Sequence, residues 1–394
     1  MREPIDIRIS SSLASIDAGD WDQLVGDDDP FVEHAFLSLL EESGSVGRGS
    51  GWEPMHVTAW RGSRLVGALP LYLKTHSYGE YIFDWSWADA AARLGISYYP
   101  KLVAMIPVTP VTGRRFLFAA DEEPTEIVSR LIDGCLQAAD STGASSIHLL
   151  FLTPEEQAWV DRDGRLMKRL SFQFHWRNEG YGSFDEFVGE FRSSMRKKLR
   201  KERRVAAKAN LEIEALRGDE LGVDEWRTLE RLYRATCGRK GSYPYLTPEF
   251  FELAPRVLDG TPLVLTAKDR GRIVAASINF AKGGHLYGRY WGADQRHDML
   301  HFELCYYRLI EHAINNGMRR FEAGAQGTHK LRRGLMPVPI HSSHWLRHPV
   351  LRQAVADFLP REAFSVQEQI RELGHHGPFR RQQNADDTRD RAAG

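Results

Sequence analysis

The chain has 394 residues, 42% hydrophobic and 27% charged, which is an ordinary globular composition over a length that favours two domains. Its formal net charge of −1 excludes a strong overall attraction to nucleic acid or membrane, so any such binding must be local. Three widely spaced cysteines without a CxxC pair argue against a disulfide framework or a structural zinc site. We expect no transmembrane segment, a cytoplasmic location and no metal or tightly bound cofactor.

Two segments echo each other at a constant offset of 208 residues. Residues 58–68 read TAWRGSRLVGA and residues 266–276 read TAKDRGRIVAA, with five identical positions. Each segment predicts a strand, a tight polar turn and a second strand, which is a β-hairpin. Strand and helix patterns follow in the same order after both segments, so we interpret the chain as a duplication. The predicted domains are 1–180 and 211–376, with a connector at 181–210 and a disordered polar tail at 377–394.

The connector is predicted to be one long amphipathic helix over residues 183–209. Ser183 and Glu186 have the spacing of a capping box, and apolar residues recur at steps of three and four. Between residues 192 and 208 there are nine Lys or Arg against one Glu. This charge either forms a solvated face or contacts phosphates. The candidate phosphate-binding residues are Lys197, Lys198, Arg200 and Lys201.

The loop GAQGTHKLRRG, residues 324–334, is the densest candidate for a functional site. It follows a predicted strand, and open α/β sheets bind ligands beyond their strand ends. Its glycines allow close approach of a ligand, and its basic side chains could meet an anion. The first half has no counterpart, because its strand IHLLFL continues into the acidic stretch TPEEQ. The candidates in the loop are Gln326 and His329 for binding the substrate, Lys330 for catalysis, and Arg332 and Arg333 for binding phosphates of the donor.

Three further residues could move a proton. His301 and Glu303 lie at a helix start and could act as general base, although they do not share a helix face. Glu322 lies on a predicted strand, where a carboxylate is either paired or catalytic. Its expected partner in the first case is Arg289.

An aromatic segment of the first half, FDWSWADA at residues 83–90, could line a substrate cleft or belong to the core. Its candidate substrate-binding residues are Asp84, Trp85, Trp87 and Asp89, and the second half offers Arg289 and Trp291. The sequence contains no P-loop, no GxSxG and no GxGxxG after a strand. These absences argue against a P-loop NTPase, an α/β-hydrolase and a Rossmann enzyme.

Several long phrases of the sequence resemble a known family. YGEYIFDWSWADA, PVTPVTG, RKKLRKERR, YGRYWGADQRHDMLHFELCYY and FEAGAQGTHKLRRG are similar to the bacterial FemAB-like proteins of peptidoglycan biosynthesis or recognition. The resemblance covers roughly residues 10–365. It implies an α/β fold of two tandem GNAT-like domains, each a mixed twisted sheet flanked by helices. It also implies transfer of an amino acid from aminoacyl-tRNA to an amine.

Two departures from the family's pattern limit that implication. The Asp that commonly precedes Gly on the family's strand is Glu322 here, and residues 295–298 lack the glycines of an acetyl-CoA pyrophosphate loop. We therefore expect an N-acyltransferase whose donor is aminoacyl-tRNA or an acyl thioester such as an acyl-CoA, and whose acceptor is an amine. Glu303, His301, Glu322 and Lys330 are its candidate catalytic residues. The alternatives are a non-catalytic ligand-recognition protein and an RNA-binding protein that uses the basic helix.

Overall fold

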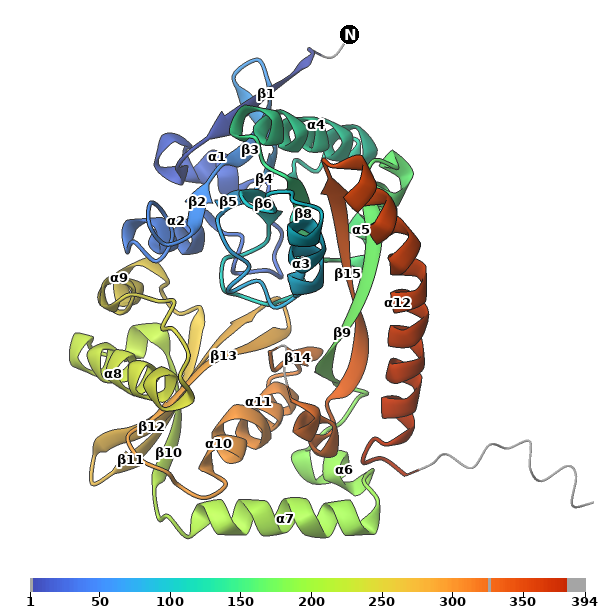
Figure 1. Ribbon diagram of the computed structural model, residues 1–394. Coiled ribbons are helices and arrows are strands. Elements are labelled where there is room, and N and C mark those ends of the chain that lie inside the picture. Colours follow the sequence, from blue (N-terminus) through green and yellow to red (C-terminus); the bar gives the residue numbers. More distant parts are fainter. Residues whose placement is uncertain (1–2, 325–326, 381–394) are drawn as a thin grey trace, which may run out of the picture.

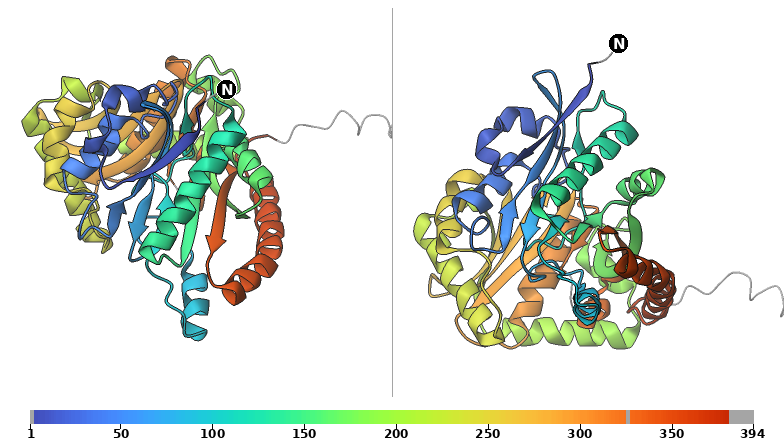
Figure 2. Two further views of the ribbon diagram at one scale, coloured as in Figure 1. Left: turned by 90° about the horizontal axis from the view of Figure 1, so that it is seen from above. Right: turned by 45° about the horizontal axis from the view of Figure 1, so that its top comes forward.

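The computed structural model describes residues 3–324 and 327–380 (Figure 1). The elements of the first half are β1 (Ile5–Ser10), η1 (Leu13–Ser15), α1 (Ala18–Asp22), α2 (His34–Glu42), β2 (Trp52–Pro54), β3 (His56–Arg61), β4 (Arg64–Leu69), β5 (Tyr72–Lys74), α3 (Trp85–Arg93), β6 (Lys101–Ala104), β7 (Leu117–Phe118), α4 (Pro124–Thr142), β8 (Ser146–Leu152), α5 (Pro154–Asp163) and β9 (Met167–Arg177). Figure 2 shows that α3 projects from the rest of the molecule.

The second half begins after β9. Its elements are α6 (Phe184–Gly189), α7 (Ser193–Ala207), β10 (Glu212–Arg217), η2 (Gly218–Glu220), α8 (Val223–Lys240), α9 (Pro248–Val257), β11 (Pro262–Asp269), β12 (Arg272–Lys282), β13 (His285–Ala293), α10 (Leu300–Phe302), a π-helical turn η3 (Glu303–Tyr307), α11 (Arg308–Asn315), β14 (Arg320–Glu322), η4 (Thr328–Arg333), β15 (Met336–Leu346) and α12 (Pro349–His375).

One continuous sheet joins the two halves. Its eleven strands run in the order β10-β11-β12-β13-β14-β9-β15-β8-β6-β5-β2, and a second sheet of the first half has the order β1-β3-β4-β7. The chain therefore has the mixed α/β architecture that the sequence predicts, as the resemblance to proteins with tandem GNAT-like domains implies, but its two halves share a sheet. They also share a core, because one cluster of buried side chains combines α1 and α2 with α8, α9, β12 and β13.

Each half contributes one long strand to the sheet of the other half. β9 pairs with β14, and β15 pairs with β8, while β9 and β15 pair with each other along most of their length. In Figure 1 they lie side by side to the right of centre. The two strands are equivalent, since Met167 pairs with His344 and His175 pairs with Met336. The strands are thus exchanged across an approximate twofold axis.

The predicted hairpins are confirmed, and they match in detail. In the first, Thr58 pairs with Ala68 and the register shifts after Ala59. In the second, Thr266 pairs with Ala276 and the register shifts after Ala267, the position 208 residues later. The same β-bulge at the same place in both hairpins supports the duplication, because bulges are specific local features of a fold.

The prediction of one helix over residues 183–209 is wrong. The segment forms α6 and α7, separated at residues 190–192. Phe191 there is buried and forms a β-bridge with Phe379, and the Arg192 amide donates to the carbonyl of Pro378. The apolar side chains of the segment keep their helical spacing on both sides of the break. Burial of Phe191 against the C-terminal segment therefore takes precedence over a continuous helix.

That contact also corrects the predicted disorder from residue 377 onward. Residues 377–380 pack against α6 and α7, with Phe379 against the rings of Phe187 and Phe191. The remainder of the predicted tail, residues 381–394, lies outside the described residues. Within 3–324 and 327–380, no helix combines the length and the apolar character that crossing a membrane requires.

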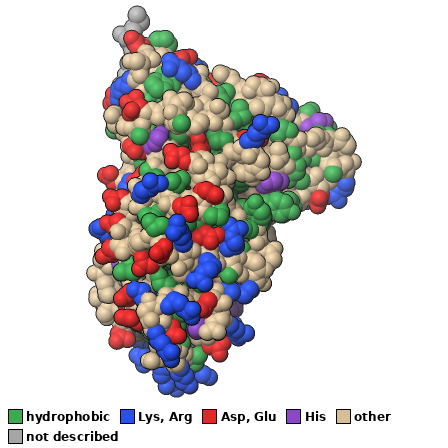
Figure 3. All heavy atoms as spheres, turned by 90° about the vertical axis from the view of Figure 1, so that its left-hand side faces the viewer, with side chains coloured by type: hydrophobic (Ala, Val, Ile, Leu, Met, Phe, Trp, Pro, Cys, Tyr) green, Lys and Arg blue, Asp and Glu red, His purple; other side chains and the backbone are tan. Residues whose placement is uncertain are grey.

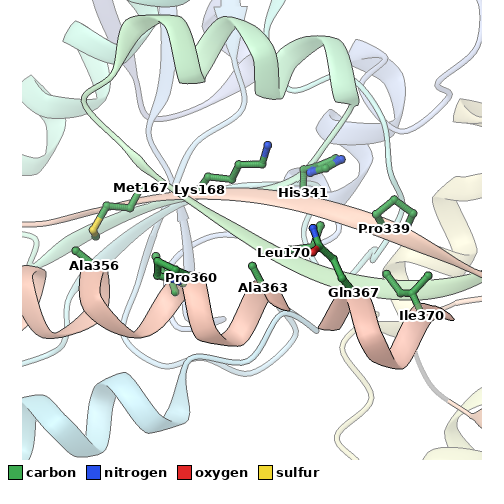
Figure 4. A pocket seen from close by; sticks show the side chains of 11 residues that line it. Met167, Lys168, Leu170, Pro339, His341, Ala356, Pro360, Ala363, Gln367 and Ile370 are labelled. Atoms are coloured by element: carbon green, nitrogen blue, oxygen red, sulfur yellow. The ribbon is translucent and has the colours of Figure 1, made fainter. Parts of the chain in front are cut away.

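The C-terminal helix α12 lies along the exchanged strands and leaves a groove beside them (Figure 4). The groove has a volume of about 610 Å³ and a mainly apolar lining. On the α12 side it is lined by Ala356, Pro360 and Ala363, whose small side chains leave a gap to Met167 and Leu170 on β9. The helix is held by the buried side chains of Leu351, Val355 and Leu359 and by an ion pair between Arg169 and Glu362 at 2.8 Å.

Candidate active site

The candidate site lies where two neighbouring parallel strands part. β13 and β14 pair only from His285 to Tyr287 and from Arg320 to Glu322, while β13 continues to Ala293. Gly324 follows β14 with a φ of +79°, a left-handed conformation that glycine adopts without strain. Diverging strands leave backbone groups unpaired at their open ends, which makes such a gap a natural place for a ligand.

Aromatic and imidazole rings cluster on the α10 side of this gap. The ring of His301 lies 5.2 Å from that of Trp291 and 5.7 Å from that of Tyr306. The Tyr306 hydroxyl is 3.1 Å from Nε2 of His329, which brings the loop after β14 to the same place. Burial lowers the pKa of His301 to about 3 and lowers the pKa of His329, so both imidazoles are neutral near pH 7.

Lys330 is a buried cation of the cluster. Its side chain is only 2% exposed, and its Nζ donates to the carbonyl of Gly324 at 2.6 Å. Burial lowers its pKa to about 7, because the ammonium loses hydration while no carboxylate within 4 Å compensates it among the described residues. Lys330 can therefore gain or lose a proton near neutral pH.

Arg333 fixes the loop against the helices. Its Nη2 donates to Glu202 of α7 at 2.6 Å, and its Cζ lies 3.5 Å from the centre of the Phe302 ring. Glu202 also accepts from the hydroxyl of Tyr307 at 2.5 Å. The π-helical turn η3 sets the direction of Tyr306 and Tyr307, and such turns occur frequently at functional sites.

Glu303 lies on the other side of this turn, where it joins α7 to the site. Arg203 of α7 donates to its carboxylate at 2.8 Å, and Nε of Arg308 lies 3.1 Å from the same oxygen. His301 and Glu303 therefore face different surroundings, as their spacing of two residues predicts. Glu303 holds the basic helix in place beside the cluster.

The expected pairing of Glu322 with Arg289 is wrong. Glu322 is fully buried and pairs with Arg320 at 3.0 Å, because both side chains leave the same face of the short strand β14. Its other oxygen accepts from the Thr112 amide at 3.2 Å. Burial raises the pKa of Glu322 to about 7. Arg289 instead donates to the carbonyl of Val108 at 2.6 Å.

Sequence reasoning missed the segment of the first half that closes one side of the gap. Residues 105–115, MIPVTPVTGRR, supply the Val108 carbonyl to Arg289 and the Thr112 amide to Glu322. The Pro110 carbonyl accepts from Gln173 on β9 at 3.2 Å. Two prolines, each without an N–H, keep this segment irregular and leave its carbonyls available to other partners.

The predicted cleft residues of FDWSWADA divide between core and surface. Asp84 is buried and bonded to Lys101 and to the Tyr98 hydroxyl, and Trp87 is buried against His344 with its ring 4.9 Å away. Trp85 and Asp89 are exposed on the projecting helix α3. Lys101 also pairs with Glu80 at 2.8 Å, so this end of the first half is a buried charge network.

The remaining candidates are cationic or lie outside the described residues. Lys and Arg side chains gather at the lower end of the molecule in Figure 3, where α7 runs in Figure 1. Gln326 is outside the described residues. The candidates whose side chains are exposed are Lys197, Lys198, Arg200 and Lys201 on α7, and Arg332 in η4.

A second echo in the sequence marks the exchanged strands. The dipeptide His-Trp occurs at residues 175–176 and 344–345, at equivalent positions of β9 and β15. His175 faces Glu322 at 3.6 Å, and His344 faces His148 at 2.8 Å. This two-residue signal is too short to stand out, although it could have indicated the exchange. No comparable pattern marks Tyr306, which reasoning from the sequence also missed.

Comparisons with known proteins agree with this architecture. No curated protein sequence matches the chain. The crystal structure of FemX is similar at a TM-score of 0.52 and 10% identity, over 89% of this chain and 100% of FemX. The C-terminal domain of a putative lysylphosphatidylglycerol synthetase from Agrobacterium fabrum is similar at a TM-score of 0.51 and 11% identity, over 89% of this chain and 96% of that domain. These likenesses show a common fold.

A conserved protein of unknown function from Bacteroides thetaiotaomicron has a TM-score of 0.51 at 11% identity, over 87% of this chain and all of its own. The profile of one family extends over nearly the whole chain. It matches residues 12–381 and is described as FemAB-like, peptidoglycan biosynthesis/recognition. The chain therefore belongs to the FemAB-like family.

Proposed function

We propose that this chain transfers an activated acyl or aminoacyl group to an amine at the cluster of His301, His329 and Lys330. The proposal rests mainly on the environment of Lys330. It is a buried lysine whose pKa lies near 7 and whose Nζ is held by the Gly324 carbonyl at the mouth of the gap between β13 and β14. A cation with one bond in an apolar site can donate to an oxygen that becomes negative during acyl transfer.

The reaction assigns a task to each group. The amine nitrogen bonds to the carbonyl carbon of the donor, and the bond from that carbon to the leaving oxygen or sulfur breaks. The attacking nitrogen becomes acidic as it bonds, and the neutral imidazole of His329 can accept its proton, whereas the pKa of His301, about 3, is too low for that task. Lys330 in its ammonium form stabilises the oxyanion and gives a proton to the leaving group. Trp291, Phe302 and Tyr306 exclude water, which would otherwise compete with the amine.

The donor is proposed to carry phosphates that contact α7. Four exposed cationic side chains, Lys197, Lys198, Arg200 and Lys201, lie on this helix, and Glu303 and Glu202 join it to the cluster. This arrangement favours aminoacyl-tRNA, and acyl-CoA is the second donor to test. Binding of RNA without transfer is the second candidate function. It predicts an RNA affinity that falls steeply with salt and is lost when the four residues are neutralised.

The test measures transfer from charged tRNA and from acyl-CoA to a panel of amines, with product detected by mass spectrometry. We expect Lys330→Ala to reduce kcat at least a hundredfold, and Lys330→Arg to reduce it nearly as much because arginine cannot release its proton near pH 7. Lys168→Ala, a surface control, leaves kcat unchanged. Undiminished transfer by Lys330→Ala contradicts the proposed site, and ligand binding without product for every donor indicates a recognition protein.

A further inference from the structure

We infer that Arg289 and the aromatic side chains around it bind an anionic group, a carboxylate or a phosphate, at the junction of the two halves. The acceptor would then be an amine that also bears a negative charge. The inference rests on the proposed function only in assigning the anion to the acceptor. The binding of the anion itself is independent of catalysis.

Arg289 is a partly buried cation without a counter-ion. Its Nη2 donates to the Val108 carbonyl, its Cζ lies 5.1 Å from the centre of the Tyr290 ring, and its Nε is buried without a partner. No carboxylate of residues 3–324 or 327–380 lies within 4 Å of its guanidinium. A guanidinium held by one carbonyl and one ring keeps part of its planar fork free for an anion.

Two residues beside Arg289 have unusual backbone conformations. Val108 accepts the hydrogen bond of the guanidinium and has a φ of +52°. Tyr81, which lies close enough to Arg289 for an electrostatic interaction, has a φ of +62°. Left-handed conformations are unfavourable for both residue types, and most severely for a β-branched residue such as valine. Such strain is retained where the surrounding structure requires a particular geometry, and it concentrates at ligand sites.

Exposed aromatic rings continue from this point over the surface. Tyr78 is 59% exposed and Tyr243 is 74% exposed, which is unusual for large rings. Tyr78 packs against Trp85 at 5.3 Å, and Tyr243 packs against Tyr245 at 5.8 Å. Tyr245 in turn lies beside Gly79 and Tyr78, so the rings come from both halves. Tyr81, which lies near both Tyr245 and Arg289, connects these rings to the guanidinium. Together they form a wall that can cover the apolar part of a bound molecule.

The position of Arg289 connects this wall to the cluster. Arg289 precedes Trp291 by two residues on β13, and Trp291 packs against His301. Two residues of an extended strand span about 7 Å. An anion on Arg289 would therefore lie one short linker away from the reacting nitrogen, which selects acceptors with an amine and an acid group in the same molecule.

The test uses two matched pairs of amines and measures their binding to the full-length protein by calorimetry. L-lysine differs from cadaverine by a carboxylate, and phosphoethanolamine differs from ethanolamine by a phosphate. We expect at least one anionic member to bind ten times more tightly than its neutral counterpart, and the pair that responds identifies the anion. In Arg289→Gln the ratio falls to about one. Arg289→Lys keeps the charge without the fork, so it retains a ratio between these values and serves as the variant to measure if the glutamine variant does not fold.

Two controls separate this inference from the proposed function. Arg93→Gln, which removes an exposed arginine from the end of α3, leaves the binding ratios unchanged. Lys330→Ala stops transfer but keeps the preference for the anionic compound. A preference that survives in Arg289→Gln, or ratios near one in the wild type, overturns the inference whether or not the protein transfers acyl groups.

Discussion

The gap between β13 and β14 in the second half has an equivalent between β6 and β8 in the first, and the two gaps differ in what fills them. β6 and β8 are also parallel and also pair over only three residues. Beyond that point Arg115 occupies the first half, fully buried, with Nε donating to Leu150 at 3.1 Å and Nη2 to Val111 at 2.5 Å. In the second half the buried cation is Lys330, with one bond to Gly324.

The two buried cations give the equivalent gaps different properties. Arg115 donates to three carbonyls and lies 3.8 Å from the Asp29 carboxylate, so most of its donors are directed to the protein, and its charge is fixed at all physiological pH values. A buried lysine with one carbonyl keeps two N–H bonds free and titrates near neutral pH. The first gap is therefore filled and the second can react.

Removing the Arg115 side chain from the gap between β6 and β8 should have the largest effect. We expect Arg115→Ala to lower the free energy of unfolding by about 3–5 kcal/mol, because it empties a buried site and leaves carbonyls without donors. Urea unfolding measures this loss. Arg114→Ala removes the exposed neighbour and should change the free energy by less than about 0.5 kcal/mol. A decrease of less than about 1 kcal/mol in the free energy of unfolding of Arg115→Ala would show that the first half is stable without an arginine in this gap.

Asp84 tests whether the first half binds substrate. It is a candidate substrate-binding residue in the sequence, but the structure places it in a buried charge network. Burial opposes its charge, but Lys101 beside it lowers the pKa of Asp84 well below its usual range. We expect Asp84→Asn to lower the free energy of unfolding by about 2–3 kcal/mol, since Lys101 loses a charged partner. The KM for the amine should not change. Asp89→Asn is the exposed control, and an increased KM with unaltered stability in Asp84→Asn would assign Asp84 to the substrate instead.

Glu322 gives an effect that depends on pH and tests the junction between the halves. Burial raises its pKa to about 7, so the folded protein keeps a proton that the unfolded chain releases above its ordinary pKa of 4.5. This proton stabilises the fold at low pH, and that contribution is lost as the pH rises from about 4.5 to 7. Glu322→Gln should remove about 3 kcal/mol of this pH dependence, measured as unfolding free energy in buffers across that range. Parallel curves for wild type and variant would place the titration elsewhere.

The fold could be predicted from local pattern because each half repeats the same local signals. The hairpins at residues 58–68 and 266–276 are specified by alternation and turn residues within eleven positions. The exchange of β9 and β15 could not be predicted, because either strand has the same pattern whichever half it pairs with. The break between α6 and α7 depends on Phe379, nearly two hundred residues away from Phe191.

The candidate site was predictable in its loop and not in its surroundings. Glycines and basic residues after a strand indicate Lys330 and Arg333, and the aromatic helix start indicates His301. Burial separates Lys330 from the exposed Arg332, and only packing in three dimensions determines burial. The segment 105–115 reaches the site from the other half through backbone groups, which leave no trace in side-chain chemistry.

The exchange of β9 and β15 also fixes the order in which the molecule can be completed during synthesis. β8 of the first half pairs with β15, whose last residue is Leu346, so the N-terminal sheet stays open until almost the entire chain has left the ribosome. Contacts of such long range form slowly and leave strand edges exposed in the meantime. A gene fragment that encodes only one half would produce a sheet with an unpaired inner edge. For this reason each half depends on a strand of the other half to complete its sheet.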